Sequence, residues 1–154
     1  WPGRVAAGKK DTKSLISAVD LLPTLVEIAG AKRPIGYKPD GVNMTRILLG
    51  ETMPLRNQAL FWKFPAPWPA PKTRPDHWVS WAMVQEDWKL VSNRDMTHSK
   101  LYRIATDTFE KHDLANQYPE VIMGMMRQLK QWRNTLPKAP SGNIFSSLRK
   151  KVTQ

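Results

Sequence analysis

The side chains best suited to bind a ligand gather in one proline-rich stretch, residues 64–78. Arg74 and His77 lie there between Trp68 and Trp78. A guanidinium group can hold a sulfate or a carboxylate through two parallel hydrogen bonds, and indole faces can stack on sugar rings. Because loops often carry binding residues, these four residues are our candidate substrate-binding group. We prefer the competing interpretation, which is an ordinary exposed loop whose tryptophans pack inward.

Other residues that could act in catalysis or metal binding have simpler structural roles. Asp20 stands at the start of an apolar helical pattern, where a carboxylate caps free N–H groups, and we prefer this role to metal binding. His98 and His112 have no partner at the spacing of metal ligands. Asp107 and Glu110 are expected to cap turns. We therefore predict no catalytic residue and no metal ligand in this sequence.

The composition favours an anionic partner. The 24 Lys and Arg residues outnumber the 13 Asp and Glu residues, which gives a net charge of +11 over 154 residues. This excess fits nucleic acid, anionic lipid or sulfated glycans, although solubility charge with a basic tail explains it equally well. The absence of cysteine excludes disulfides, thiolate metal sites and a cysteine nucleophile within these residues. No apolar run is long enough for a membrane span.

Residues 17–30 (SAVDLLPTLVEIAG) give the strongest helical pattern of the first 55 residues. Their apolar side chains recur three or four positions apart and form a wide stripe, so we expect this helix to be mostly buried. Pro23 lacks an N–H group and must lie in the first turn or cause a kink. Gly30 is expected to end the helix. A second, short helix is predicted within residues 42–49, before Gly50.

The second half of the chain predicts an α+β arrangement. Strands are expected at residues 56–63, 78–85, 88–92 and 101–104, with Glu86 and Asp87 linking a hairpin. Residues 119–136 carry an apolar helical stripe that would cover one face of the sheet.

Three methionines of this helix, Met123, Met125 and Met126, are expected to serve in packing. Residues 137–154 are expected to form a disordered basic tail, and Arg149, Lys150 and Lys151 are better explained as solvated charges than as a phosphate site.

The order of several short motifs resembles the later part of the sulfatases of the arylsulfatase type, which have an alkaline-phosphatase-like fold. The motifs are Trp1-Pro2-Gly3, residues 17–30, Asp40-Gly41-Val42, Trp88-Lys89-Leu90, Leu101-Tyr102, Asp113-Leu114-Ala115 and Pro119-Glu120. Together they cover residues 1–136. The chain departs from the family pattern at Arg103, Thr108 and Asp113, which are structural positions.

The resemblance implies that residues 1–55 end the main sulfatase domain and that residues 56–136 form a C-terminal subdomain. The formylglycine nucleophile, the calcium ligands and the catalytic Lys and His of the family would all precede Trp1, so we expect a piece of a longer chain that is not catalytic alone. Such a piece would complete the fold and one wall of the substrate cleft.

The same resemblance implies three further properties. The partner would be the missing N-terminal sulfatase domain, the substrate a sulfated carbohydrate or another sulfate ester, and the location periplasmic or extracellular. The alternative function is a free-standing basic module that binds polyanions, with nucleic acid the less favoured ligand.

Overall fold

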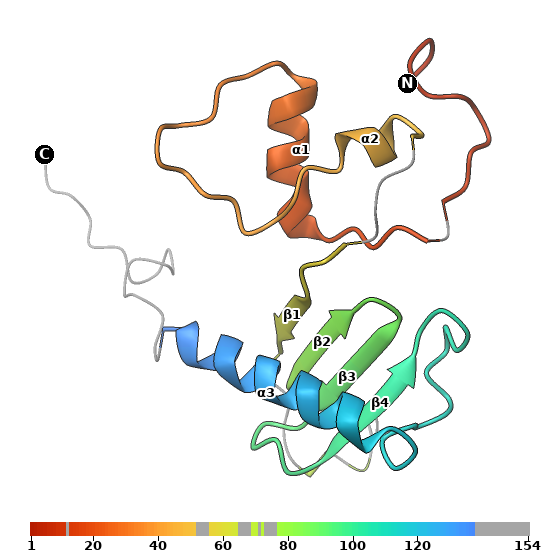
Figure 1. Ribbon diagram of the computed structural model, residues 1–154, viewed down its shortest axis with the longest axis vertical. Coiled ribbons are helices and arrows are strands. Elements are labelled where there is room, and N and C mark those ends of the chain that lie inside the picture. The colour runs from red at the N-terminus through yellow and green to blue at the C-terminus, as the bar shows by residue number, and fades with distance from the viewer. Residues whose placement is uncertain (12, 52–55, 65–68, 71, 73–76, 138–154) are drawn as a thin grey trace, which may run out of the picture.

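The computed structural model describes residues 1–11, 13–51, 56–64, 69, 70, 72 and 77–137. Two groups of elements lie one above the other in Figure 1. The first contains the helices η1 (Ala18–Asp20), α1 (Leu21–Ile28) and α2 (Thr45–Leu48). The second contains the strands β1 (Leu60–Lys63), β2 (Trp81–Gln85), β3 (Trp88–Ser92) and β4 (Ser99–Arg103), followed by the helix α3 (Pro119–Thr135). The predicted α+β class is confirmed. The predicted tail lies outside the described residues from position 138 onward.

The four strands form an antiparallel sheet in their chain order, β1-β2-β3-β4. Leu90 pairs with Met83 on one side and with Leu101 on the other, so these three fully buried side chains make a row across the sheet. Glu86 and Asp87 form the predicted hairpin link, and Glu86 has the positive φ of 53° that a tight turn requires. Strand β2 begins three residues later than expected, because the chain is still in a turn at Trp78.

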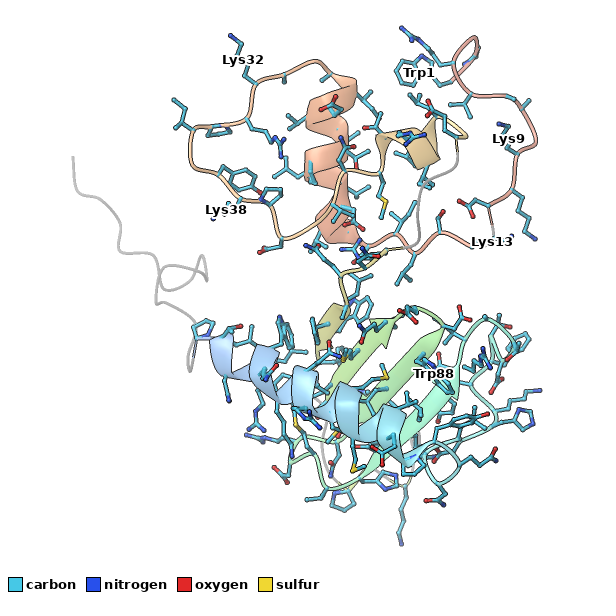
Figure 2. The ribbon with its side chains drawn as sticks, viewed as in Figure 1. Trp1, Lys9, Lys13, Lys32, Lys38 and Trp88 are labelled. Atoms are coloured by element: carbon cyan, nitrogen blue, oxygen red, sulfur yellow. The ribbon has the colours of Figure 1, made fainter. Side chains whose placement is uncertain are left out.

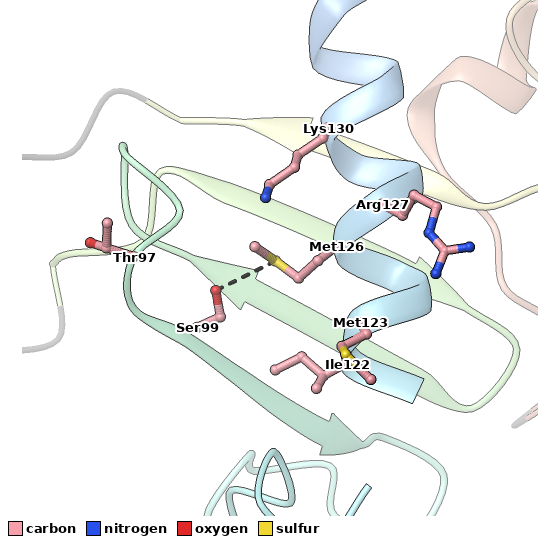
Figure 3. A pocket seen from close by; sticks show the side chains of 7 residues that line it. All are labelled: Thr97, Ser99, Ile122, Met123, Met126, Arg127 and Lys130. Carbon is pink, nitrogen blue, oxygen red and sulfur yellow. Dashed lines mark hydrogen bonds between the residues drawn. The ribbon is translucent and has the colours of Figure 1, made fainter. Parts of the chain in front are cut away.

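Helix α3 lies across one face of this sheet, as its apolar stripe predicts (Figure 1). Leu129 and Met125 are buried against the central strands, and the ring of Trp132 stacks on Phe61 at 5.0 Å. The sulfur of Met126 contacts the hydroxyl of Ser99 (Figure 3). The main core lies where this helix packs on the row of buried strand residues.

One methionine of α3 departs from the expected packing. Met123 is 51% exposed, whereas Met125 is buried and Met126 packs against the core. Position 123 lies about 160° around the helix from Met125 and about 120° from Leu129, because successive helical residues are about 100° apart. It therefore faces outward.

The opposite face of the sheet carries a smaller apolar cluster. Trp78, Val91 and Tyr102 are buried there, with Ala82 packed against them. Burial raises the pKa of the Tyr102 hydroxyl, and the carboxylates of Asp113, Glu110 and Asp107 add to the increase. The sheet is therefore covered on both faces.

The helix predicted over residues 17–30 is present but divided. A 3-10 turn at Ala18–Asp20 passes directly into α1, and Pro23 is the third residue of that helix, where its missing N–H group costs nothing. Gly30 has a φ of 61°, and the N–H group of Ala31 donates to the carbonyl oxygen of Val26 at 3.0 Å. This is the expected glycine-dependent helix end.

The described residues do not provide the burial expected for this helix. Only Pro23 and Thr24 of α1 are buried, where the helix meets the segment that leads into α2. Its large apolar side chains are about half exposed, with values of 44% for Val19, 49% for Leu21, 53% for Leu22 and 56% for Leu25. The reason is that the described residues supply a covering segment on one side of the helix and none on the other.

The loops around these helices are strongly basic. Lys13, Lys32 and Lys38 extend outward from them, whereas Lys9 points toward the end of α2 (Figure 2). The ammonium group of Lys9 donates to the carbonyl oxygen of Gly50 at 2.8 Å, which ties the first loop to the end of α2. These lysines contribute to the excess of positive charge without forming a compact cluster.

Candidate functional site

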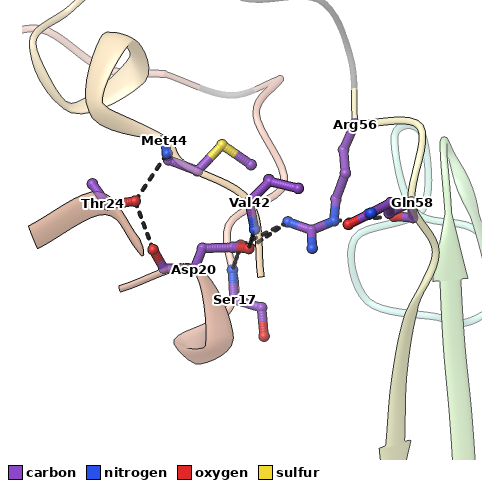
Figure 4. Close-up of polar contacts among 7 residues, drawn as sticks. All are labelled: Ser17, Asp20, Thr24, Val42, Met44, Arg56 and Gln58. Carbon is purple, nitrogen blue, oxygen red and sulfur yellow. Dashed lines mark hydrogen bonds and ion pairs between the residues drawn. The ribbon is translucent and has the colours of Figure 1, made fainter. Parts of the chain in front are cut away.

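A buried polar cluster surrounds Asp20, between the helices and the segment that leads into β1 (Figure 4). Its carboxylate accepts hydrogen bonds from the backbone N–H groups of Ser17 and Val42, each at 2.8 Å. The guanidinium of Arg56 reaches both carboxylate oxygens through Nη1, at 2.8 and 2.7 Å. The predicted capping role of Asp20 is confirmed by the bond from Ser17.

Thr24 extends this cluster by one turn of the helix. Its hydroxyl donates to the carbonyl oxygen of Asp20 at 2.6 Å and accepts from the N–H group of Met44 at 2.9 Å. Gly41 passes so close to the backbone of Val19 that an added Cβ would lie 2.1 Å from its carbonyl oxygen. These contacts bring the Asp40-Gly41-Val42 motif against the start of α1.

Opposing effects act on the carboxyl group of Asp20. Burial is the largest effect and raises its pKa, but hydrogen bonds from Arg56, Ser17 and Val42 together outweigh burial and hold the pKa below the ordinary value of 3.8. The side chains of Arg56 and Asp20 are only 3% and 1% exposed. Asp20 is therefore an ionised carboxylate in a dry environment whose donors are all supplied by this chain.

Sequence reasoning missed Arg56. It stands 36 positions after Asp20, at the first residue of the strand predicted over residues 56–63, and no periodic pattern marks it as a partner of Asp20. One arginine among many basic residues gives no signal of burial, because Arg is usually exposed. The pairing appears only when the chain folds.

The predicted substrate-binding group is only partly described. Arg74 and Trp68 lie outside the described residues. His77 is half-buried, and its ring meets the edge of Phe64 at 5.7 Å. The Trp78 ring lies 4.7 Å from that of His98, and Trp78 is 9% exposed within the smaller core cluster. Trp78 thus packs inward and offers no open face to a sugar, whereas binding through the other three residues stays a prediction.

The other residues considered for chemistry have local partners. The carboxylate of Asp107 accepts from the N–H groups of Lys111 at 3.1 Å and His112 at 2.9 Å, which confirms its turn-capping role. Glu110 instead forms an ion pair with Lys89. His112 is 78% exposed. His98 is exposed, and its ring also contacts that of Trp78.

The described residues do not fit a calcium site. No group of three or more His, Asp or Glu side chains comes together among them. The carboxylate of Asp20 is held by Arg56, and that of Asp107 by backbone donors. Calcium requires six to eight oxygen ligands placed together, which these residues do not supply. In the same part of the chain, no helix combines the length and apolar character that a bilayer crossing requires.

Comparison with known proteins identifies the chain over most of its length. Residues 1–135 match the family model described as N-sulphoglucosamine sulphohydrolase, C-terminal. Human arylsulfatase G is 41% identical over 54 residues, which are 35% of this chain and 10% of that protein. N-acetylgalactosamine-6-O-sulfatase of Bacteroides thetaiotaomicron is 25% identical over 143 residues, which are 84% of this chain and 25% of that protein. The chain thus spans a quarter or less of these relatives.

Solved structures share the fold. The protein Ps i-CgsB, in complex with k-i-k-neocarrahexaose, superposes with a TM-score of 0.63 at 26% identity, over 86% of this chain and 27% of its own. A 2-O GAG sulfatase superposes with a TM-score of 0.55 at 19% identity, over 75% of this chain and 24% of its own. The sulfatase resemblance of the short motifs is confirmed, and the chain belongs to the sulfatases through their N-sulphoglucosamine sulphohydrolase C-terminal family.

Proposed function

We propose that this chain is the C-terminal part of a sulfuric ester hydrolase and completes the fold of that enzyme without being catalytic alone. The observation that carries the proposal is the apolar face of η1 and α1. Val19, Leu21, Leu22 and Leu25 are 44% to 56% exposed on adjacent turns. Contiguous exposed apolar surface marks an interaction site, and the larger size of the relatives supports a further domain as its partner.

In this proposal, residues 1–55 belong to the main domain and residues 56–136 form a subdomain beside it. Arg56 stands at the boundary, and its buried pair with Asp20 joins the two parts. A fixed junction would hold the sheet and α3 at a set angle once α1 docks on the main domain. The subdomain would then form one wall of the substrate cleft.

The chemistry of sulfate-ester hydrolysis is assigned to the proposed N-terminal part. Formylglycine and the calcium ligands would come from there, because the carboxylates described here already have other partners. Two of the related proteins are named as an N-acetylgalactosamine-6-O-sulfatase and a 2-O GAG sulfatase, and these names support a sulfated carbohydrate as substrate. His77 and its loop remain our candidates for contacting the sugar beyond the sulfate. A periplasmic or extracellular location fits such a substrate.

The test begins with the native protein, isolated through an antibody against residues 119–136. Its intact mass and its hydrolysis of 4-nitrophenyl sulfate and a sulfated disaccharide would be measured with and without a calcium chelator. We expect a mass several times the 17.7 kDa of this chain, and activity that the chelator removes. Hydrolysis by the 154-residue chain alone would overturn the proposal.

A matched pair of variants tests the apolar face in the native protein. Leu22→Asp places a charge on the face of α1 and should abolish soluble, active enzyme, because burying an unpaired carboxylate costs several kcal/mol. Phe109→Asp makes the same kind of change at a side chain that is 81% exposed on a loop of the subdomain, and should leave activity unchanged. Equal activity of the two variants would show that the α1 face has no partner.

The alternative is a free-standing module that binds polyanions, favoured by the net charge of +11. It predicts a native mass near 17.7 kDa, no hydrolysis, and binding to heparin that weakens steeply with salt.

A further inference from the structure

A pocket lies between α3 and the start of β4, apart from the junction around Asp20 (Figure 3). Its volume is about 530 Å³. The lining residues are Thr97, Ser99, Ile122, Met123, Met126, Arg127 and Lys130. Ile122 and Met126 are partly buried against the main core and form an apolar floor. Methionine adapts its shape easily, so this floor suits a flexible apolar chain.

Three of the four polar side chains that line the pocket can donate a hydrogen bond to a ligand, whereas the fourth, Ser99, donates to Ser92. Arg127 and Lys130 are exposed, and neither takes part in the ion pairs found among the described residues. The hydroxyl oxygen of Thr97 accepts from the side chain of Asn93 at 3.0 Å, so its O–H group remains a donor. Residues 121–137 contain no Asp or Glu that would neutralise the two cations. The rim therefore attracts an anion while the floor attracts hydrocarbon.

We propose that this pocket binds a free single-chain amphiphilic anion, a carboxylate or sulfate with an unbranched apolar tail. The anionic head would lie between Lys130 and Thr97, the tail would lie on Ile122 and Met126, and Arg127, which points to the other side of α3, would add to the positive charge nearby (Figure 3). This pocket belongs to the sheet and α3, and its proposed ligand does not depend on the proposed sulfatase function.

Two other occupants fit the pocket less well. A sugar ring prefers an aromatic platform, and none of the described residues that line this pocket is aromatic. A bilayer surface prefers several apolar side chains that protrude beyond the cations, whereas here only Met123 of the described lining residues is an exposed apolar side chain, and Ile122 and Met126 are partly buried. A free amphiphile satisfies both the apolar floor and the charged rim.

Decanoate, kept below its micelle concentration, is the probe. The full chain would carry ¹³C-methyl methionine, and decanoate would be added in steps while methyl resonances are recorded. We expect saturable shifts of the Met123 and Met126 methyl groups and no shift of Met44, which is buried near α2. An unshifted Met126 methyl group would overturn the proposal.

Charge variants then test the head group. Lys130→Gln removes one charge-assisted hydrogen bond and should raise the Kd for decanoate about tenfold. Lys111→Gln removes the same charge from an exposed loop outside the pocket and should leave the Kd unchanged. If both variants changed the Kd equally, the binding would come from general charge attraction, and the proposed head-group site would be refuted.

A third arm separates the free amphiphile from a membrane. Neutral and anionic lipid vesicles are sedimented with the chain in the absence of decanoate, and we expect the chain to stay in the supernatant. Sedimentation that Lys130→Gln abolishes, without decanoate binding in solution, would assign the surface to a membrane and refute the proposal.

Discussion

The pair of Asp20 and Arg56 gives the sharpest test of how this chain is held together. Asp20→Asn keeps the size of the side chain but removes its charge, and it leaves the guanidinium of Arg56 in a place where that side chain is only 3% exposed. The new amide nitrogen cannot accept from Ser17 or Val42, so at least one buried donor also loses its acceptor. Removing one partner of a buried ion pair costs about 3–5 kcal/mol.

The measurement is the free energy of unfolding in urea, followed by tryptophan fluorescence and far-ultraviolet circular dichroism. A matched control is Glu51→Gln, which breaks the ion pair with Arg46 in which the side chains are 52% and 60% exposed. That pair should contribute no more than about 1 kcal/mol. The contrast between the two variants isolates the effect of burial.

Further variants of the Asp20–Arg56 pair test the same interaction if Asp20→Asn does not fold. Arg56→Lys keeps the positive charge but removes the planar guanidinium group. The decrease in its free energy of unfolding should therefore lie between those of Asp20→Asn and the control. The double variant Asp20→Asn with Arg56→Met should lose less free energy of unfolding than the two single variants lose together, because no unpaired charge remains. A loss below about 1 kcal/mol for both Asp20→Asn and Arg56→Lys would refute the reasoning.

Three further predictions follow from the same structure. Because the folded pKa of Asp20 lies below its ordinary value of 3.8, the stability that its ionisation contributes is present above that value and is lost as the pH falls through the folded pKa. Urea unfolding between about pH 6 and about pH 2 should therefore show a smaller loss of stability in Asp20→Asn than in the unaltered chain. Leu129→Ala empties a fully buried position of the main core and should cost about 2–5 kcal/mol, which a lower urea midpoint would report and an unchanged midpoint would contradict. Gly124→Ala adds a methyl group in open space within α3 and should stabilise the chain by about 0.5–1 kcal/mol, whereas Gly41→Ala would force a Cβ to within 2.1 Å of a carbonyl oxygen and should destabilise it, as the two melting temperatures would show.

The sheet and α3 were predicted well because their patterns are local. The polar link at Glu86 and Asp87 fixes a hairpin between neighbouring strands, and the period of the apolar residues in 119–136 defines the face of the helix that packs. Pro23 and Gly30 likewise act through their own backbone geometry, which does not depend on distant residues. The family could also be predicted, since its motifs follow one another in a fixed order.

Burial was harder to predict than secondary structure. The stripe on η1 and α1 indicated a buried helix, yet Leu22 and Leu25 are more than half exposed among the described residues. Amphipathic spacing predicts that a face prefers apolar surroundings, and it cannot say which segment provides them. For Trp78 the sequence left both an open binding surface and inward packing possible, and the structure places it in the smaller core cluster.

The sequence by itself determined the order of the helices and strands, the apolar face of each helix and the membership in the sulfatases. Only the tertiary structure decided that Asp20 meets Arg56, that α1 keeps an exposed apolar face, and that Lys130 lies at the rim of an apolar pocket. The physical reason is the range of the interactions. Backbone conformation and helical periodicity depend on residues a few positions apart, whereas a buried ion pair or a pocket depends on side chains that approach one another only after the chain has folded.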